Sequence, residues 1–343
     1  MPRDFLTPSP SLDDASILVT GGTGSFGQAL IRTVLARYRP RRIVVFSRDE
    51  LKQYEMEKKI AAADSQRVRF FIGDVRDVER LELAMREIDV VIHAAALKHV
   101  PTAEYNPFEC VKTNIHGAEN VVMAALRAKV AKIVALSTDK AASPINLYGA
   151  SKLASDKIFV AANNLAGAQN TRFSVVRYGN VLGSRGSVLL YFQELIASGA
   201  TTLPITHADM TRFWITLQQG VDFVLSSLAM MSGGEVFVPK IPSMKVVDVA
   251  RALAPDLEHE FIGIRPGEKL HETMVTEDDG RLTLEIGDRY IIEPALAFWS
   301  NAHLAERDVK PVAEGFEYSS DRNSEWLDAA SLLELTKENA GGG

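Results

Sequence analysis

Short apolar runs alternate with longer amphipathic stretches along the first half of the chain. The apolar runs are rich in Ile, Val and Phe, as in buried strands, and lie at 17–20, 43–46, 68–71, 90–93, 133–136 and 173–178. Between them, helical spacing predicts helices at about 26–38, 49–62, 77–87, 107–128 and 148–167. This alternation predicts a parallel sheet with helices on both faces.

The pattern changes after residue 180, where Gly and Pro become frequent and the predicted elements become shorter. We therefore predict an α/β protein, with a Rossmann-type doubly wound parallel sheet and a smaller α+β substrate-binding domain. The predicted boundaries are a flexible N-terminal arm at 1–16, a nucleotide-binding domain at 17–180 and a smaller domain at 181–338. We expect the chain to cross between the two domains.

Composition narrows the possible functions. The 343 residues carry a net charge of −6, which argues against a nucleic-acid-binding surface. No apolar run reaches the roughly 18 residues that a membrane span needs, so we expect no membrane partner. The single cysteine, Cys110, excludes an intrachain disulfide framework and favours a cytoplasmic location. It lies in an apolar helical run, so we expect a buried side chain rather than a nucleophile, and the histidines show no metal-ligand spacing.

A glycine-rich turn follows the first predicted strand and opens the first predicted helix. Gly21, Gly24 and Gly27 form a G-x-x-G-x-x-G pattern. Such glycines permit a tight turn and a close approach of the backbone to a pyrophosphate at a helix N-terminus. The pattern alone is a weak signal, but its place between strand and helix predicts a bound dinucleotide.

The end of the second predicted strand favours NADP over NAD. An NAD site usually has an acidic residue there, whereas this strand ends in Ser47-Arg48-Asp49, with Lys52 one turn further on. Arg48 and Lys52 are suited to a 2′-phosphate, since a guanidinium offers a fork of donors. The alternative is a solvated Arg48, with Asp49 only capping the next helix.

The segment from Thr138 to Lys152 carries the candidate catalytic groups. Tyr148 and Lys152 are four positions apart and therefore share one helix face. A nearby ammonium would favour the phenolate of Tyr148, which a base near neutral pH requires. Asp139 and Lys140 follow a predicted parallel strand at its carboxyl end, where ligands bind, although in isolation such a pair is usually a solvated charge pair.

These stretches together resemble the extended short-chain dehydrogenase/reductases. Longer motifs narrow the resemblance to the soluble UDP-N-acetylglucosamine 4,6-dehydratases that invert carbon 5 of the sugar. The motifs are the segments 47–52, 96–101, 137–142, 177–181, 210–214 and 265–269, within a resemblance that runs from about 15 to 335. Related hexose dehydratases have Glu after Thr-Asp, whereas this chain has Lys140.

The resemblance implies an internal redox cycle in which NADP ends as it began. Tyr148 would take the proton of the 4-hydroxyl, a neutral Lys140 would remove the proton of carbon 5, and a protonated Asp139 would donate to the departing 6-hydroxyl. Those roles require that Asp139 and Lys140 do not simply neutralise each other. The product would be UDP-2-acetamido-2,6-dideoxy-L-arabino-hex-4-ulose, made in the first step of pseudaminic acid synthesis.

The resemblance also assigns binding residues. The expected cofactor contacts are Gly21, Thr23, Gly24, Ser25, Phe26, Gly27, Ser47, Arg48, Leu51, Lys52, Asp74, Val75, Ala94, Ala95, Tyr148, Lys152 and Val181. The expected substrate contacts are Lys98, Lys140, Asn180, Arg185, Arg212, Arg265 and Glu268, with the arginines suited to the pyrophosphate of UDP-N-acetylglucosamine.

Relatives pair two long helices, which makes 107–128 and 148–167 candidates for the interface of a homo-oligomer, a dimer or a larger assembly such as a hexamer. Two other functions stay open at this point. One is a nucleotide-sugar epimerase or reductase with the same Tyr148 and Lys152. The other is a non-catalytic NADP-sensing protein.

Overall fold

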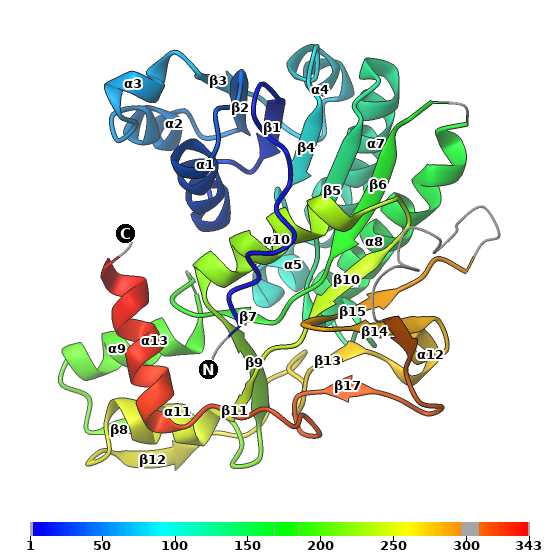
Figure 1. The fold of residues 1–343 in the computed structure, drawn as a ribbon. Helices are drawn as coiled ribbons and strands as arrows, with labels where there is room; N and C mark the ends of the chain where they lie inside the picture. The colour runs from blue at the N-terminus through cyan, green and yellow to red at the C-terminus, as the bar shows by residue number, and fades with distance from the viewer. Residues whose placement is uncertain (1–2, 168, 185, 296–308, 342–343) are drawn as a thin grey trace.

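The computed structural model describes residues 3–167, 169–184, 186–295 and 309–341. Within these ranges a ten-stranded sheet forms the centre of the molecule, in the order β16-β14-β15-β10-β6-β5-β4-β1-β2-β3 (Figure 1). Seven neighbouring strands of this sheet, β10, β6, β5, β4, β1, β2 and β3, are parallel to one another. Next to β10, the strands β15, β14 and β16 continue the sheet with antiparallel pairing. In chain order these strands are β1 (Ser16–Thr20), β2 (Arg42–Ser47), β3 (Val68–Ile72), β4 (Val90–His93), β5 (Lys132–Leu136), β6 (Arg172–Val176), β10 (Val236–Pro239), β14 (Thr283–Ile286), β15 (Arg289–Ile292) and β16 (Val309–Pro311).

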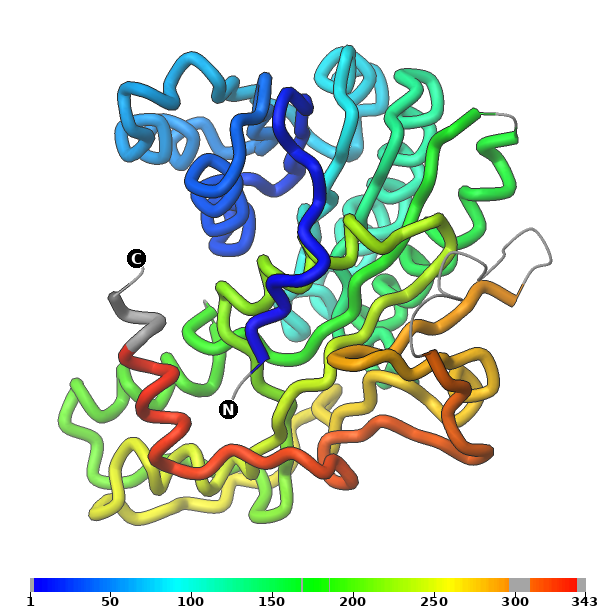
Figure 2. Tube along the Cα trace, in the orientation of Figure 1, coloured from blue at the N-terminus to red at the C-terminus, as the bar shows by residue number. Residues whose placement is uncertain are grey.

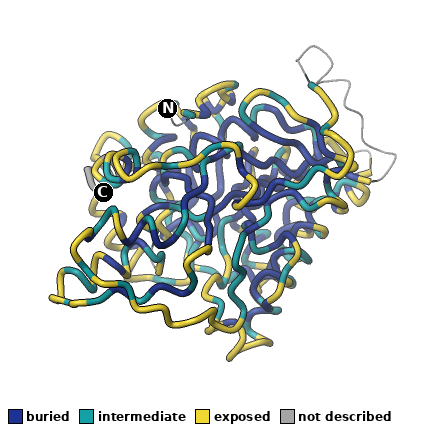
Figure 3. The backbone as a smooth tube through the Cα atoms, turned by 90° about the horizontal axis from the view of Figure 1, so that it is seen from below, coloured by how far each residue is buried: buried dark blue, intermediate teal, exposed yellow. Residues whose placement is uncertain are grey.

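Helices cover both faces of this sheet. On one face α1 lies beside α10, and on the other α4, α7 and α8 are neighbours (Figure 1). The helices around the main sheet are α1 (Ser25–Arg37), α2 (Glu50–Glu57), α3 (Ala62–Ser65), α4 (Val78–Ala84), α5 (Val100–Tyr105), α6 (Pro107–Val111), α7 (Gly117–Ala128), α8 (Leu147–Leu165) and α10 (Leu217–Met230). The central strands are buried from both sides, as their continuous apolar runs require, and the exposed positions follow the outer loops and helices (Figure 3). The predicted Rossmann-type sheet is confirmed.

One predicted helix is interrupted. The stretch 107–128 forms α6, then a π-helical segment, η1 (Lys112–His116), and then α7. The wide turn of η1 carries Asn114, whose side chain accepts from Leu97 N at 2.8 Å and donates to Leu97 O at 2.9 Å and to Ser151 Oγ at 2.9 Å. Because these partners come from other elements, helical spacing could not predict the interruption. The stretch 49–62 likewise divides, into α2 and α3.

The predicted flexible arm is wrong for residues 3–15, which pack against the sheet domain (Figure 2). Phe5 and Leu12 are each 2% exposed and belong to the main core. The Phe5 ring lies 5.1 Å from the ring of Phe223 on α10, and Ser226 Oγ donates to Thr7 O at 3.0 Å. Two apolar side chains separated by polar positions gave no periodic signal, so the sequence did not reveal this packing.

The chain after residue 180 builds a second core and also completes the first. The second core gathers Leu189, Phe192, Trp214 and Val249 among others. Its elements are β7 (Asn180–Val181), α9 (Val188–Ala197), β8 (Thr202–Ile205), β9 (Thr211–Ile215), β11 (Ser243–Lys245), α11 (Val246–Leu253), β12 (Glu258–Phe261) and α13 (Ala329–Gly341). The strands β10, β14, β15 and β16 return to the main sheet. The chain therefore crosses between the two parts, as the sequence predicted.

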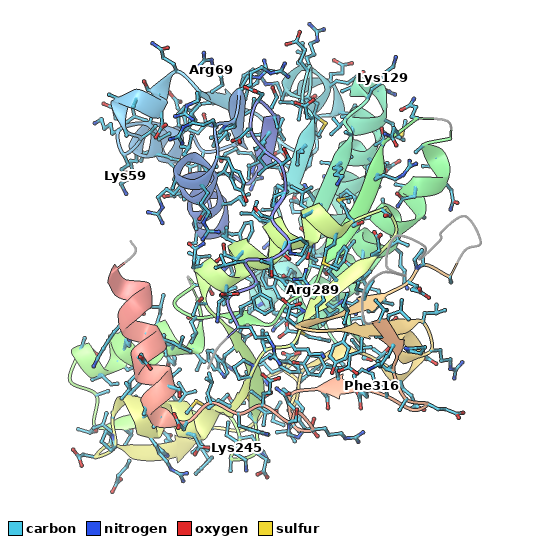
Figure 4. The ribbon with its side chains drawn as sticks, viewed as in Figure 1. Lys59, Arg69, Lys129, Lys245, Arg289 and Phe316 are labelled. Carbon is cyan, nitrogen blue, oxygen red and sulfur yellow. The ribbon has the colours of Figure 1, made fainter. Side chains whose placement is uncertain are left out.

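The returning strands are tied to the sheet domain by buried contacts. Arg289 on β15 is 1% exposed, donates to Ser226 Oγ at 2.7 Å and lies 4.7 Å from the ring centroid of Phe223 (Figure 4). On the other side of this junction the rings of Tyr290 and Phe316 are 5.0 Å apart. Beside them β13 (Thr273–Val275), α12 (Glu277–Gly280) and β17 (Tyr318–Ser319) complete the fold. No helix in the described ranges is long and apolar enough to cross a bilayer.

Candidate active site

A cleft of about 1420 Å³ lies where the carboxyl ends of the parallel strands face the second core. Nearly all of the predicted binding residues line it. The predicted residues that do so are Gly21, Thr23, Gly24, Ser25, Phe26, Gly27, Ser47, Arg48, Lys52, Asp74, Val75, Ala94, Ala95, Lys98, Lys140, Tyr148, Lys152, Asn180, Val181, Arg212, Arg265 and Glu268. Leu51 is not among the lining residues and is 64% exposed, and its assignment to the cofactor site stays a prediction. Arg185 lies outside the described residues.

The glycine turn has the close contacts that its pattern predicts. A Cβ on Gly21 would lie 2.9 Å from Ala95 N, and its φ of +65° is in the left-handed region. A Cβ on Gly27 would lie 2.5 Å from the Cα of Gly22, which would separate α1 from the turn. Gly24 is the N-cap of α1 and offers no side-chain acceptor. The first amides of this 13-residue helix therefore face the cleft as donors suited to a pyrophosphate.

Two cations lie at the carboxyl end of β2. Arg48, with 54% of its side chain exposed, is 3.5 Å from Asp74, and Lys52 Nζ is 2.8 Å from Asp49. The Asp49 carboxylate also accepts a hydrogen bond from Lys52 N at 3.0 Å and caps α2, so the helix cap that the sequence predicted at Asp49 is confirmed. Because both cations are exposed at the surface, these ion pairs contribute little to stability. They remain available to an anion of higher charge, as a 2′-phosphate carries.

Tyr148 and Lys152 lie on the inner face of α8, as predicted. Asn146 caps this helix by accepting from Gly149 N at 2.7 Å. Lys152 Nζ donates to Leu136 O at 2.7 Å, at the end of β5. Burial lowers the pKa of Lys152, and Asp156, one turn further along α8, opposes that shift.

The electrostatics of Tyr148 differ from the expectation. Burial raises the pKa of Tyr148 to about 12, although the charge of Lys140 and a hydrogen bond with Thr138 act in the opposite direction. Desolvation of the phenolate therefore outweighs every positive group that the chain places nearby. In the chain by itself the positive charge that lowers the pKa of Tyr148 is that of Lys140, and the expectation that a lysine and the cofactor lower it together stays a prediction.

Asp139 and Lys140 form a direct ion pair, which the sequence analysis argued against. Lys140 Nζ is 3.0 Å from Asp139 Oδ1 and 3.1 Å from Glu272 Oε1. Burial lowers the pKa of Lys140, but the Asp139 and Glu272 carboxylates outweigh this and raise it well above its usual range. Lys140 is therefore an ammonium, not the neutral amine that a base needs. Asp139 is 1% exposed and lies behind Lys140 rather than on the cleft surface.

The arginines of the second core are unequal. Arg212 is 7% exposed, and its guanidinium donates to the carbonyls of Thr211 at 2.7 Å, Lys269 at 2.9 Å and Leu270 at 3.1 Å. It holds the segment at 269–270 in place, and these contacts occupy much of its donor fork. Arg265, with 60% of its side chain exposed, lies 2.7 Å from Glu268 and has the freedom to meet a pyrophosphate.

Sequence reasoning missed Glu272, which contacts Lys140 from the segment before β13, and gave no role to Lys269. Lys269 ends the motif at 265–269, and Glu272 lies just beyond that motif without a pattern of its own. Lys269 Nζ donates to Ala142 O at 2.5 Å, and Asn146 Nδ2 donates to Gly267 O at 2.8 Å, so this segment closes over the site from the far side of the cleft. Such contacts join residues more than 100 positions apart, so only the fold reveals them. No cluster suited to a metal ion occurs among the described residues.

Comparisons with known proteins agree with this site. A family model described as "Polysaccharide biosynthesis protein" matches residues 17–294. The chain belongs to this family. Among its relatives, the UDP-N-acetylglucosamine 4,6-dehydratase (inverting) of Campylobacter jejuni strain 81-176 is 57% identical over 333 residues, covering 95% of this chain and 98% of that protein. The resemblance drawn from the motifs is confirmed.

Other relatives of the polysaccharide biosynthesis protein family have different names. The UDP-glucose 4-epimerase of Rickettsia canadensis is 41% identical over 333 residues, covering 94% of this chain and 95% of that protein. An X-ray structure of Pen from Bacillus thuringiensis superposes with a TM-score of 0.86 at 34% identity, covering 96% and 99% of the two chains. A dTDP-glucose 4,6-dehydratase from Streptomyces venezuelae, crystallised with NAD, shares the fold at 20% identity and a TM-score of 0.67, over 95% and 98% of the chains.

Proposed function

We propose that this protein is an NADP-dependent hydro-lyase, a UDP-N-acetylglucosamine 4,6-dehydratase that inverts carbon 5. One observation carries the proposal: Tyr148 and the Lys140–Asp139 pair line or underlie the same cleft as the glycine turn. The 57% identity to the Campylobacter jejuni enzyme over nearly the whole of both chains supports the substrate and the stereochemistry. The product would enter pseudaminic acid synthesis.

The chain can bind the dinucleotide with groups of suitable chemistry. The amides at the start of α1 fit the pyrophosphate, and Arg48 and Lys52 fit a 2′-phosphate. Lys152 Nζ, bound to Leu136 O, lies one helical turn from Tyr148 and can also reach a ribose hydroxyl. When bound, the dinucleotide supplies the hydride acceptor, a positive charge on its ring, and the hydride that is later returned to the sugar.

Tyr148 is the proposed base for the 4-hydroxyl. The phenol is buried and hydrogen-bonded to Thr138, which fixes its direction. With a pKa near 12 in the chain alone, it needs a further positive charge to act near neutral pH. We therefore propose that Tyr148 becomes a useful base only in the complex with the oxidised cofactor.

The Lys140–Asp139 ion pair can supply the acid and the base of water elimination. A proton that moves across the 3.0 Å contact from Lys140 Nζ to Asp139 Oδ1 leaves a neutral amine and a protonated carboxyl, with no change in net charge. Substrate that displaces water from the cleft favours this neutral form, because desolvation disfavours both ions. The amine then takes the proton of carbon 5, and the carboxyl donates to the departing 6-hydroxyl, which requires the buried Asp139 side chain to turn toward the cleft.

The experiment is incubation of the purified protein with UDP-N-acetylglucosamine labelled with deuterium at carbon 4, without added reductant. We expect loss of one water by mass and a new methyl signal that carries the deuterium. Unlabelled methyl, or unchanged substrate, would contradict the proposal. Proton NMR of the early product distinguishes the L-arabino from the D-xylo configuration, and occupancy measured with NADP and NAD separately tests the cofactor preference.

A second candidate function is epimerisation of a nucleotide sugar, which the 41% identity to the Rickettsia canadensis protein favours. Epimerisation would also use Tyr148 and Lys152, but it requires no acid–base pair at carbons 5 and 6. An epimer without mass loss in the same incubation would identify it. A non-catalytic NADP sensor would bind the cofactor and leave the sugar unchanged.

We also propose that the protein is a cytoplasmic homo-oligomer, a dimer or larger, whose subunits pair through α6–α7 and α8. Analytical ultracentrifugation would test the oligomeric state.

A further inference from the structure

Three oxygen atoms surround Lys140 Nζ: those of Asp139 and Asn180 accept its hydrogen bonds, and that of Glu272 forms an ion pair with it. They are Asp139 Oδ1 at 3.0 Å, Glu272 Oε1 at 3.1 Å and Asn180 Oδ1 at 3.4 Å. Asp139 follows β5 of the main sheet and Asn180 begins β7, whereas Glu272 reaches the amine from the segment before β13. Glu272 thus supplies the contact that the motifs around Lys140 do not contain.

Glu272 is firmly placed. Its side chain is 2% exposed. Its backbone N–H donates to Ser320 Oγ at 2.9 Å, and its carbonyl accepts from Ser320 N at 2.8 Å. Ser320 Oγ in turn lies 2.6 Å from Thr211 Oγ1 on β9. A buried carboxylate fixed by its own backbone is suited to holding a charge at a set distance from Lys140.

The charges around Lys140 oppose one another. Negative groups are Asp139 and Glu272, while Arg212 Nε lies 3.8 Å from Glu272 Oε1 and Lys269 Nζ lies 3.8 Å from Glu272 Oε2. Tyr148, which also interacts with Lys140, is a neutral phenol at ordinary pH. Glu272 is therefore the one carboxylate shared by all three cations of this cluster, and Oε2 has no hydrogen-bond partner among the described residues.

We propose that Glu272 is a positioning residue that keeps Lys140 protonated and aimed at Asp139 and Asn180 until the substrate binds. The proposal rests on the proposed function for its catalytic meaning, because it makes Glu272 the group that sets when Lys140 releases its proton. A proton leaves Lys140 for Asp139 only against the attraction of Glu272. Removing the Glu272 charge should therefore make the neutral amine easier to form.

The test measures the Lys140 amine directly and needs no substrate. Trace acetic anhydride acetylates only neutral amines, so the acetylated fraction of the Lys140 peptide, followed by mass spectrometry, reports its protonation. At pH 8.5 we expect Glu272→Gln to raise the labelling rate of Lys140 at least tenfold. The reason is that loss of an adjacent opposite charge lowers the pKa of an amine by roughly 1 to 3 units. An unchanged or slower rate would overturn the proposal.

A matched control is Glu235→Gln. Glu235 is also buried and also accepts hydrogen bonds, from Ser174 Oγ at 2.6 Å and Gly233 N at 2.8 Å, but it lies away from the cleft lining. It should leave the labelling of Lys140 unchanged. If Glu272→Gln does not fold, Glu272→Asp withdraws the charge by one methylene and should give an increase smaller than tenfold; a rate equal to that of the unaltered protein would then count against the proposal.

Turnover provides the second reading. In Glu272→Gln the rising limb of the rate against pH should move to lower pH, whereas a merely structural loss would lower the rate equally at all pH values. If the unaltered protein does not dehydrate UDP-N-acetylglucosamine, the proposed function fails, while the labelling result still decides the role of Glu272 toward Lys140.

Discussion

At the scale of single residues, burial decides the protonation of the site. Tyr148, Lys140 and Lys152 all lie at the buried end of the cleft, and each has its pKa moved by desolvation together with the charges beside it. The chain alone holds Tyr148 as a phenol and Lys140 as an ammonium. Both groups therefore rest in the form that cannot act as a base, and their activation depends on what binds.

Tyr148→Phe tests the proposed base. The variant keeps the packing of the ring and should still bind NADP, but we expect the rate of dehydration to fall by about 10²- to 10⁴-fold, as for loss of a general base. Single-turnover formation of the 4-keto product is the measurement. A rate within a few-fold of the unaltered protein would assign proton removal to another group.

His93 gives an acid-sensitive contribution to stability. It is 2% exposed, its Nδ1 lies 2.8 Å from Thr20 Oγ1, and burial lowers its pKa to about 3, with a smaller effect from Lys152. The unfolded chain, with a pKa of about 6.5, binds the proton first, so stability falls as pH drops below that value. Between pH 7 and 5 the loss should be about 2 kcal/mol.

The variant His93→Asn should lose that pH dependence while being less stable than the unaltered protein at pH 7. Denaturant unfolding at pH 7 and at pH 5, for both proteins, gives the two differences to compare. If both proteins lose the same free energy of unfolding between pH 7 and pH 5, the acid sensitivity comes from a group other than His93.

Sequence reasoning at this scale reached groups that are neighbours along the chain. Tyr148 and Lys152 share a helix face, and Asp139 and Lys140 follow one strand, so local geometry was enough to group them. The same reasoning erred on the Asp139–Lys140 contact, because charge state depends on Glu272, which is more than 100 residues away. Local patterns therefore predict which residues meet the cleft better than they predict how those residues are charged.

At the scale of elements, the turn from β1 into α1 fixes the cofactor end. Gly27→Ala should disrupt it, because the new Cβ would lie 2.5 Å from the Cα of Gly22 and backbone atoms cannot withdraw as a flexible side chain can. We expect NADP affinity to fall at least tenfold, or about 1.4 kcal/mol, by equilibrium titration.

Gly220→Ala is the matched control for that change. Gly220 also lies in a helix, α10, but a Cβ there would meet no atom within 4 Å. It should leave NADP binding unchanged and raise the free energy of unfolding by roughly 0.5 to 1 kcal/mol. Equal affinities for all three proteins would contradict the role given to the turn.

The elements also show where patterns are sufficient. Apolar runs predicted the six strands β1 to β6, and in the central ones burial on both faces leaves a continuous apolar signal. The π-segment η1 was missed because Asn114 is drawn inward by Leu97 and Ser151, which are brought beside it only by the fold.

At the scale of the whole molecule, the N-terminal segment stabilises the junction between sheet and helices. Phe5→Ala should cost about 3 kcal/mol or more of unfolding free energy, because a buried ring in contact with Phe223 is removed. Leu6→Ala, at a neighbouring side chain that is 45% exposed, should change it by less than about 0.5 kcal/mol. Similar losses in the two variants, measured by denaturant unfolding, would indicate a loose segment.

The position of β10 has a consequence for dissecting the protein. This strand lies against β6 in the parallel sheet, yet it is reached only after the chain has passed through β7, α9, β8 and β9 of the second core. A fragment that stops at 180 would leave the backbone amides and carbonyls of β6 without their neighbour, and such a bare border recruits strands from other molecules. The two halves are accordingly better recovered by co-expression and reassembly than as separately folded modules.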